Sequence, residues 1–212
     1  MDGLGAGDML TFYYAKKSAA FAPHILLEDI GADYEAVQID MKSGEQRSDS
    51  YLAINPKGRL PSLATDQGIL TETPAILLYL AQIFPDHKLV PDTPFELANA
   101  LAFNLYIAST VHVAHAHKHR GHRWADDEAA RESMRSKVCE NMTECARVIE
   151  MHYLKGPWVL GENYSICDPY LALATRWFRD DGVDLDAFKL ISAHERLMHQ
   201  RKSMQRVLEL HS

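Results

Sequence analysis

The stretch NPKGRLPSLATDQGILTETPAI, residues 55–76, combines two turns, two short apolar segments and the start of a helix. Pro61 has no N–H to donate to a sheet, so we expect it at the mouth of a strand, where it leaves the backbone groups of its neighbours free. The dipeptide Thr73-Pro74 then opens the apolar run 75–84. Threonine suits the N-cap position of this predicted helix, and proline suits its first turn.

This helix start also predicts a kind of ligand. The first turn of a helix carries unpaired N–H groups and the positive end of the helix dipole, and it therefore favours anions. Free backbone groups near Pro61, beside such a helix start, suit a peptide-like ligand that carries both an ammonium and a carboxylate group. Glu72 is predicted to hold the cation and Thr73 the anion.

The residues before this stretch predict a strand, a helix and a second strand. Residues 10–15 are rich in aromatic and β-preferring side chains, helical periodicity follows from Ser18 to Gly31, and residues 34–40 alternate as a strand. A crossover of this length implies parallel strands joined in the right-handed sense.

The remainder of the stretch completes the first domain. Segments 62–65 and 69–71 flank a short connection that contains glycine, which predicts an antiparallel hairpin. With the helix over 74–84, the chain forms a βαβ-ββα unit, an α/β N-terminal domain, which we place at residues 9–86.

An all-α C-terminal domain is predicted after this unit. Residues 87–95 contain Pro91 and Pro94 without periodicity and are expected to form a linker. Residues 96–212 show helical spacing, first over 97–111 and 126–153 and later over 171–178 and 183–210. The pattern Ser165-x-x-Asp168 before the third of these helices indicates a capping motif, so we assign both residues to folding.

Composition excludes several classes of function. The chain has 212 residues, 47% hydrophobic content and a net charge of −7, which argues against a nucleic-acid partner because phosphate binding needs a clustered basic surface. We find no uninterrupted apolar run near the roughly 20 residues that cross a bilayer, so no membrane partner is expected. Residues 1–8 lack the features of a signal peptide and are expected to be a loose tail. The three cysteines have no metal-ligand spacing, which fits free thiols in the cytoplasm.

The motifs together resemble the glutathione S-transferase family, over nearly the whole chain from Leu10 to about Leu208. The resemblance rests on Ala22-Pro23-His24-Ile25, on residues 54–61 and 70–76, and on residues 161–168, and it is most similar to the bacterial beta class. It implies a thioredoxin-like N-terminal domain that binds glutathione, followed by an all-helical domain. It also implies a homodimer.

Several binding roles follow from the resemblance. Leu60 would pair its backbone with the cysteinyl part of glutathione across a cis peptide to Pro61, although only about 5% of X-Pro bonds are cis. The acidic and hydroxyl residues that hold the γ-glutamyl end of glutathione correspond to Glu72 and Thr73. Arg59 would reach the glycyl carboxylate, with Lys57 or Lys42 as alternatives.

The chain departs from the beta class at the position of its cysteine, where Ala19 stands here. A mixed disulfide with glutathione is therefore impossible at that position. Ser18 is the nearest hydroxyl donor for a bound sulfur, and Ser18 and Tyr14 are our candidate catalytic residues. The alternative for Ser18 is a helix N-cap, and the alternative for Tyr14 is an aromatic residue of the core.

A histidine-rich segment lies in the helical half, from His112 to His122. The resemblance places His112 and His115 at the second-substrate pocket. A solvated or dimer-facing stripe is the alternative. Imidazoles at helical spacing could also bind a metal ion, but the segment lacks acidic and thiolate ligands, so we expect no metal.

These observations favour a glutathione transferase that conjugates the glutathione thiolate to small apolar electrophiles. A glutathione-dependent peroxidase or isomerase remains an alternative, because the same thiolate attacks peroxides and adds to conjugated bonds. A glutathione-binding protein with little turnover is another, because the cysteine is missing. A metal-binding module built on the histidines is a further alternative.

Overall fold

The computed structural model describes residues 10–212, so the predicted loose tail lies outside the described residues. The chain divides into two compact units. The first unit comprises the chain up to Val90 together with His199–Ser212, and the second comprises Pro91–Met198. The C-terminal segment thus groups with the first unit, whereas the sequence-based boundaries assigned all of residues 96–212 to the helical domain.

A mixed four-stranded sheet forms the centre of the first unit, in the order β2-β1-β3-β4. The strands are β1 (Leu10–Tyr14), β2 (Tyr34–Gln38), β3 (Ser62–Thr65) and β4 (Gly68–Thr71). Strand β1 runs parallel to β2 and antiparallel to β3, and β3 pairs with β4 as an antiparallel hairpin. The predicted parallel crossover and hairpin are therefore confirmed.

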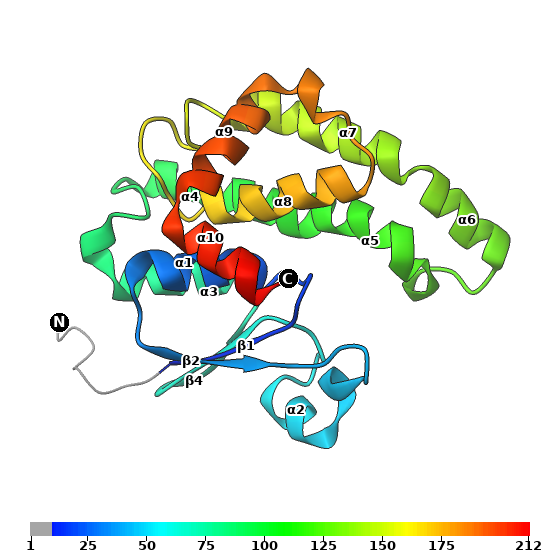
Figure 1. The fold of residues 1–212 in the computed structure, drawn as a ribbon, viewed down its shortest axis with the longest axis horizontal. Coiled ribbons are helices and arrows are strands. Elements are labelled where there is room, and N and C mark those ends of the chain that lie inside the picture. Colours follow the sequence, from blue (N-terminus) through cyan, green and yellow to red (C-terminus); the bar gives the residue numbers. More distant parts are fainter. Residues whose placement is uncertain (1–9) are drawn as a thin grey trace. The chain divides into compact units, whose positions relative to one another are not determined.

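Helices α1 (Phe21–Ile30), α3 (Thr73–Ile83) and α10 (Lys202–Leu210) lie on one side of this sheet, and α2 (Asp49–Ile54) lies on the other (Figure 1). Helix α1 is buried along most of its length because seven of its ten residues are apolar. It ends at Gly31, which adopts the left-handed conformation at φ 60°, as the predicted stop requires. Helix α2 was not predicted from the sequence.

The second unit is built from helices. They are α4 (Pro94–Tyr106), α5 (His112–Arg120), α6 (Glu128–Ser136), α7 (Val138–Val148), α8 (Asp168–Asp180) and α9 (Lys189–Gln200). The last two residues of α9 lie beyond the boundary of this unit at Met198. Phe103, Ile107, Met142, Ile149 and Phe178 are fully buried and mark its core. A π-helical turn, Ile107–Val111, joins α4 to α5 without a break.

The helical stretch Pro94–Arg123 corrects one expectation from the sequence. Its 30 residues are long and apolar enough, by length and composition alone, to cross a membrane. Asn, Ser, Thr and His interrupt the apolar residues of this stretch, so it holds no long uninterrupted apolar run. It nevertheless passes by composition, because residues 97–117 contain no Asp, Glu, Lys or Arg. The core helix of a soluble protein has the same properties, so this observation is weak evidence for a span.

The predicted capping motif lies at the start of α8, but Cys167 rather than Ser165 is the N-cap residue, and no side chain caps the helix. The buried Asp168 carboxylate accepts hydrogen bonds from the backbone N–H of Ser165 at 2.7 Å and of Val159 at 2.8 Å. Nε2 of the fully buried His194 lies 3.1 Å from Oδ1, the carboxylate oxygen that also accepts from Val159. The carboxylate therefore joins the start of α8, the preceding loop and α9.

A buried histidine pair joins α1 to the C-terminal end of the chain. Nδ1 of His24 lies 2.9 Å from Nε2 of His211, and the His24 side chain has no exposed surface. Tyr14 and Tyr34 pack edge-on against the His24 ring. Burial, together with the smaller effect of the nearby Arg206 charge, lowers the pKa of His24 from 6.5 to about 4.

This pair predicts an acid-sensitive fold. The folded chain holds His24 neutral down to about pH 4, whereas the unfolded chain binds a proton near pH 6.5, so stability is lost as the pH falls through this window. Between pH 7 and 5 we expect a loss of about 2 kcal/mol from this group. Denaturant unfolding at both pH values should show that H24Q reduces the dependence on pH. The exposed control H87Q should leave it unchanged, and an equal dependence in H24Q and the parent chain would contradict the assignment.

Candidate functional site

The hairpin register brings the predicted binding residues together. Ser62 pairs with Thr71, so Pro61 and Glu72 lie at the same end of the hairpin. The Leu60–Pro61 peptide is cis, as predicted. The backbone N–H and C=O of Leu60 form no hydrogen bond with any of residues 10–212. Leu60 therefore presents a free donor and a free acceptor beside the start of α3.

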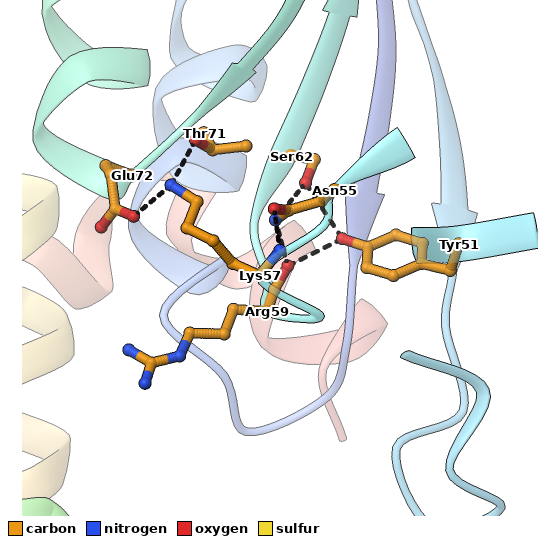
Figure 2. A network of polar contacts seen from close by, with 7 residues as sticks. All are labelled: Tyr51, Asn55, Lys57, Arg59, Ser62, Thr71 and Glu72. Atoms are coloured by element: carbon orange, nitrogen blue, oxygen red, sulfur yellow. Dashed lines mark hydrogen bonds and ion pairs between the residues drawn. The ribbon is translucent and has the colours of Figure 1, made fainter. Parts of the chain in front are cut away.

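A buried polar network holds the loop that leads to this peptide bond (Figure 2). The Asn55 amide donates to the Arg59 carbonyl at 2.8 Å and to the Ser62 hydroxyl at 3.1 Å, and its side chain is buried. The Tyr51 hydroxyl donates to the same carbonyl at 2.8 Å. Burial raises the pKa of Tyr51, which keeps this donor protonated. The network leaves the loop little freedom to move.

Gly58 sets the close approach of this loop to its neighbour. Its φ is 57°, in the left-handed region, and a Cβ atom there would lie 2.8 Å from the Gln46 carbonyl oxygen. Only glycine combines this conformation with this contact at low cost. The loop is therefore packed against the segment that precedes α2.

Lys57 extends from this loop to the start of α3. Its ammonium lies 2.5 Å from Oε1 of Glu72 and 2.6 Å from the Thr71 hydroxyl, and Figure 2 shows the side chain directed at both. The Arg59 guanidinium points away from this contact (Figure 2) and forms no ion pair with any of residues 10–212. Lys57 and Arg59 are thus close in sequence, but only the Lys57 side chain is directed at Glu72.

The start of α3 differs from the prediction in its cap. Glu72, not Thr73, occupies the N-cap position, with φ 73° and no side-chain cap bond. Thr73 is the first helical residue, and its buried hydroxyl donates to the Ala19 carbonyl at 3.4 Å. The prediction of Thr73 as N-cap is wrong, because the hydroxyl bonds to the turn before α1 instead. This bond brings that turn next to the start of α3.

The turn before α1 contains the candidate catalytic residues. The Ser18 hydroxyl donates to the Ala15 carbonyl at 2.7 Å and accepts from the Ala20 N–H at 3.2 Å. Ala20 is the N-cap residue of α1, so Ser18 does not cap the helix itself. The Tyr14 hydroxyl lies 3.4 Å from Oε1 of Gln38, and the ring is buried. Tyr14 therefore has the surroundings of a core residue.

The other predicted residues lie elsewhere. Lys42 is exposed in the loop after β2, where its N–H donates to Asp40. In the second unit, the rings of His112 and His115 stack on Trp177 with centroids 4.7 and 5.0 Å away. His115 also lies 2.7 Å from the buried Asp181 carboxylate. Within residues 10–212, no cluster of three or more His, Cys, Asp or Glu is arranged to hold a metal ion.

Sequence reasoning missed the residues that support the loop. Asn55 and Tyr51 were not singled out, although an asparagine before proline at a turn is a known signal for local backbone bonding. The pairing of Lys57 with Glu72 was also missed, because it depends on the hairpin register that brings Thr71 beside Ser62.

The network predicts a stability cost at Asn55. Replacing it in N55A removes a buried amide that supports the Arg59 carbonyl and the Lys57 N–H, and we expect a loss of about 2–3 kcal/mol. The matched control is Q67A, at an exposed hairpin position, which should change stability by less than about 0.5 kcal/mol. Denaturant titration measures both, and a cost for N55A no larger than that of Q67A would refute the supporting role.

Comparison with known proteins identifies the family. Residues 9–82 match the glutathione S-transferase N-terminal domain. The chain is 28% identical to glutathione S-transferase GstA of Escherichia coli, over 94% of this chain and 97% of that protein. It is 27% identical to a maleylacetoacetate isomerase of Pseudomonas aeruginosa, over 86% of this chain and 87% of that protein.

A solved structure gives the strongest of these similarities. A glutathione transferase homolog from sulfitobacter, determined with bound glutathione, is 42% identical, with a TM-score of 0.92 over 95% of this chain and 98% of that chain. This identity, over nearly the full length of both chains, shows a shared family as well as a shared fold. The chain belongs to the glutathione transferase family.

Proposed function

We propose that this protein is a glutathione transferase of beta-like type that conjugates the glutathione thiolate to small apolar electrophiles. The observation that carries the proposal is the pair of free backbone groups on Leu60, held beside a cis peptide and next to the acidic start of α3. A peptide thiol fits this arrangement, because its cysteinyl part would pair with Leu60 and its ammonium with Glu72.

Glutathione must reach the electrophile as a thiolate. A free thiol titrates near pH 8.5, so lowering its pKa by one to two units requires roughly 1.4 to 3 kcal/mol of differential stabilisation. In the proposal, the Ser18 hydroxyl and the N-terminus of α1 supply this stabilisation together. The hydroxyl would turn from the Ala15 carbonyl to the sulfur, which needs only rotation about its side-chain bonds.

The Glu72 assignment predicts a loss of binding. E72Q keeps the size of the side chain and removes its charge, so the bond to the ligand's ammonium weakens and glutathione affinity should fall by about 10- to 100-fold. Titration calorimetry measures the change. E35Q, at an exposed position on β2, is the control and should bind normally. Should the parent chain fail to bind glutathione, the proposed function is wrong.

The Ser18 assignment predicts a change in chemistry with little change in binding. S18A should raise the pKa of the bound thiol by about one unit and slow conjugation about tenfold below that pKa. The thiolate's ultraviolet absorbance and the rate with an aryl halide report these effects. S136A is the control, because the Ser136 hydroxyl makes the same kind of local bond, to the Ser133 carbonyl. If the pKa of the bound thiol is unchanged in S18A, the catalytic assignment is wrong and Ser18 only stabilises the turn.

A second candidate is glutathione-dependent isomerisation, which the similarity to a maleylacetoacetate isomerase favours. There the thiolate adds to a conjugated double bond, the resulting single bond rotates, and elimination returns the thiolate. A panel of aryl halides, peroxides and conjugated cis-dicarboxylates assayed with glutathione separates conjugation, peroxidase activity and isomerisation. Binding without turnover on the whole panel would favour the binding-protein alternative.

The remaining assignments rest on the family resemblance. The proposal keeps His112 and His115 as residues that contact the second substrate, Arg59 and Lys42 as partners of the glycyl carboxylate, and a homodimer as the working assembly. A reducing compartment such as the cytoplasm suits the three cysteines, all of which are free thiols.

A further inference from the structure

Lys57 and Glu72 form an exposed ion pair at the proposed glutathione site. The Lys57 side chain is 43% exposed and that of Glu72 is 65% exposed. Ion pairs this exposed contribute little to stability, because water screens the attraction. The pair is nevertheless well positioned, since Thr71 accepts a second bond from the same ammonium at 2.6 Å. Stability alone therefore gives little reason for this arrangement.

The position of Lys57 is fixed by its backbone. Its N–H donates to Oδ1 of Asn55 at 3.1 Å, and Asn55 is anchored in the buried network below the loop. Gly58, the next residue, is held against the Gln46 carbonyl. The lysine stem therefore starts from a rigid point and ends at the N-cap residue of α3.

The pair places one positive and one negative group side by side at a helix start. An α-amino acid group carries the complementary pair, a carboxylate and an ammonium on one carbon atom. Its ammonium would take the Glu72 carboxylate, and its carboxylate would take the Lys57 ammonium together with first-turn N–H groups of α3. Thr71, which already accepts from Lys57, would keep the lysine in place during this exchange.

We propose that Lys57 recognises the α-carboxylate at the γ-glutamyl end of glutathione, by exchanging its bond to Glu72 for a bond to the ligand. This inference rests on the proposed function. It removes Lys57 from the candidates for the glycyl carboxylate and leaves Arg59, whose guanidinium points away from Glu72 (Figure 2). The site then requires a free α-amino acid group on its ligand and rejects thiols that lack one.

The test pairs two variants with altered ligands. K57M and R59M each remove one charge from an exposed side chain, so both should fold normally, as melting temperature and circular dichroism will report. Calorimetry then measures the affinity for three ligands. These are glutathione, its γ-glutamyl α-carboxamide, which lacks the α-carboxylate charge, and its glycyl ethyl ester, which lacks the glycyl charge.

For K57M we expect an affinity loss of about tenfold or more for glutathione and the ester, and almost none for the carboxamide, which has already lost the partner of Lys57. R59M should show the reverse pattern, and K57R should recover most of the affinity. Equal losses of K57M on glutathione and the carboxamide would overturn the Lys57 assignment alone. Absence of glutathione binding by the parent chain would overturn the proposed function, and the assignment with it.

Discussion

The hydrogen bonds of the Asn55 amide are the interaction on which the site depends. The loop before β3 carries backbone N–H and C=O groups. Any of these that is buried without a hydrogen-bond partner costs about 1–3 kcal/mol. Asn55 and Tyr51 both donate to the Arg59 carbonyl, and Asn55 also accepts from Lys57. With these groups satisfied from inside, the next residue along, Leu60, keeps its own donor and acceptor for a ligand. The hydrogen bonds that hold the loop therefore do not use the backbone N–H and C=O of Leu60.

Much of the first unit could be predicted because its signals are local. The crossover followed from a change in periodicity, the hairpin from a short connection with glycine, and the helix end from Gly31. The cis peptide before Pro61 followed from the family resemblance. Helix α2 escaped because it has only six residues and buries only Tyr51, too little for a periodic pattern. Its one local signal was Ser48, whose hydroxyl accepts from the Tyr51 N–H.

The errors at the site have a common physical origin. Thr73 has the right chemistry for an N-cap, and no local rule shows that the Ala19 carbonyl, far away in sequence, takes its hydroxyl instead. The pairing of Lys57 with Glu72 was missed, because it is the hairpin register that brings the two residues together. Residue type indicated which groups could act, and tertiary pairing determined which partners they have.

In the proposed function, binding and activation of the thiol fall to separate segments. The loop before β3 and the start of α3 would hold the peptide backbone, and the turn before α1 would surround the thiol. The bond from the Thr73 hydroxyl to the Ala19 carbonyl links the two segments. Because this bond uses the backbone carbonyl of Ala19, it does not depend on the side chain at that position. Under the proposed function, side chains of the turn can therefore differ without disturbing the residues that would hold the peptide.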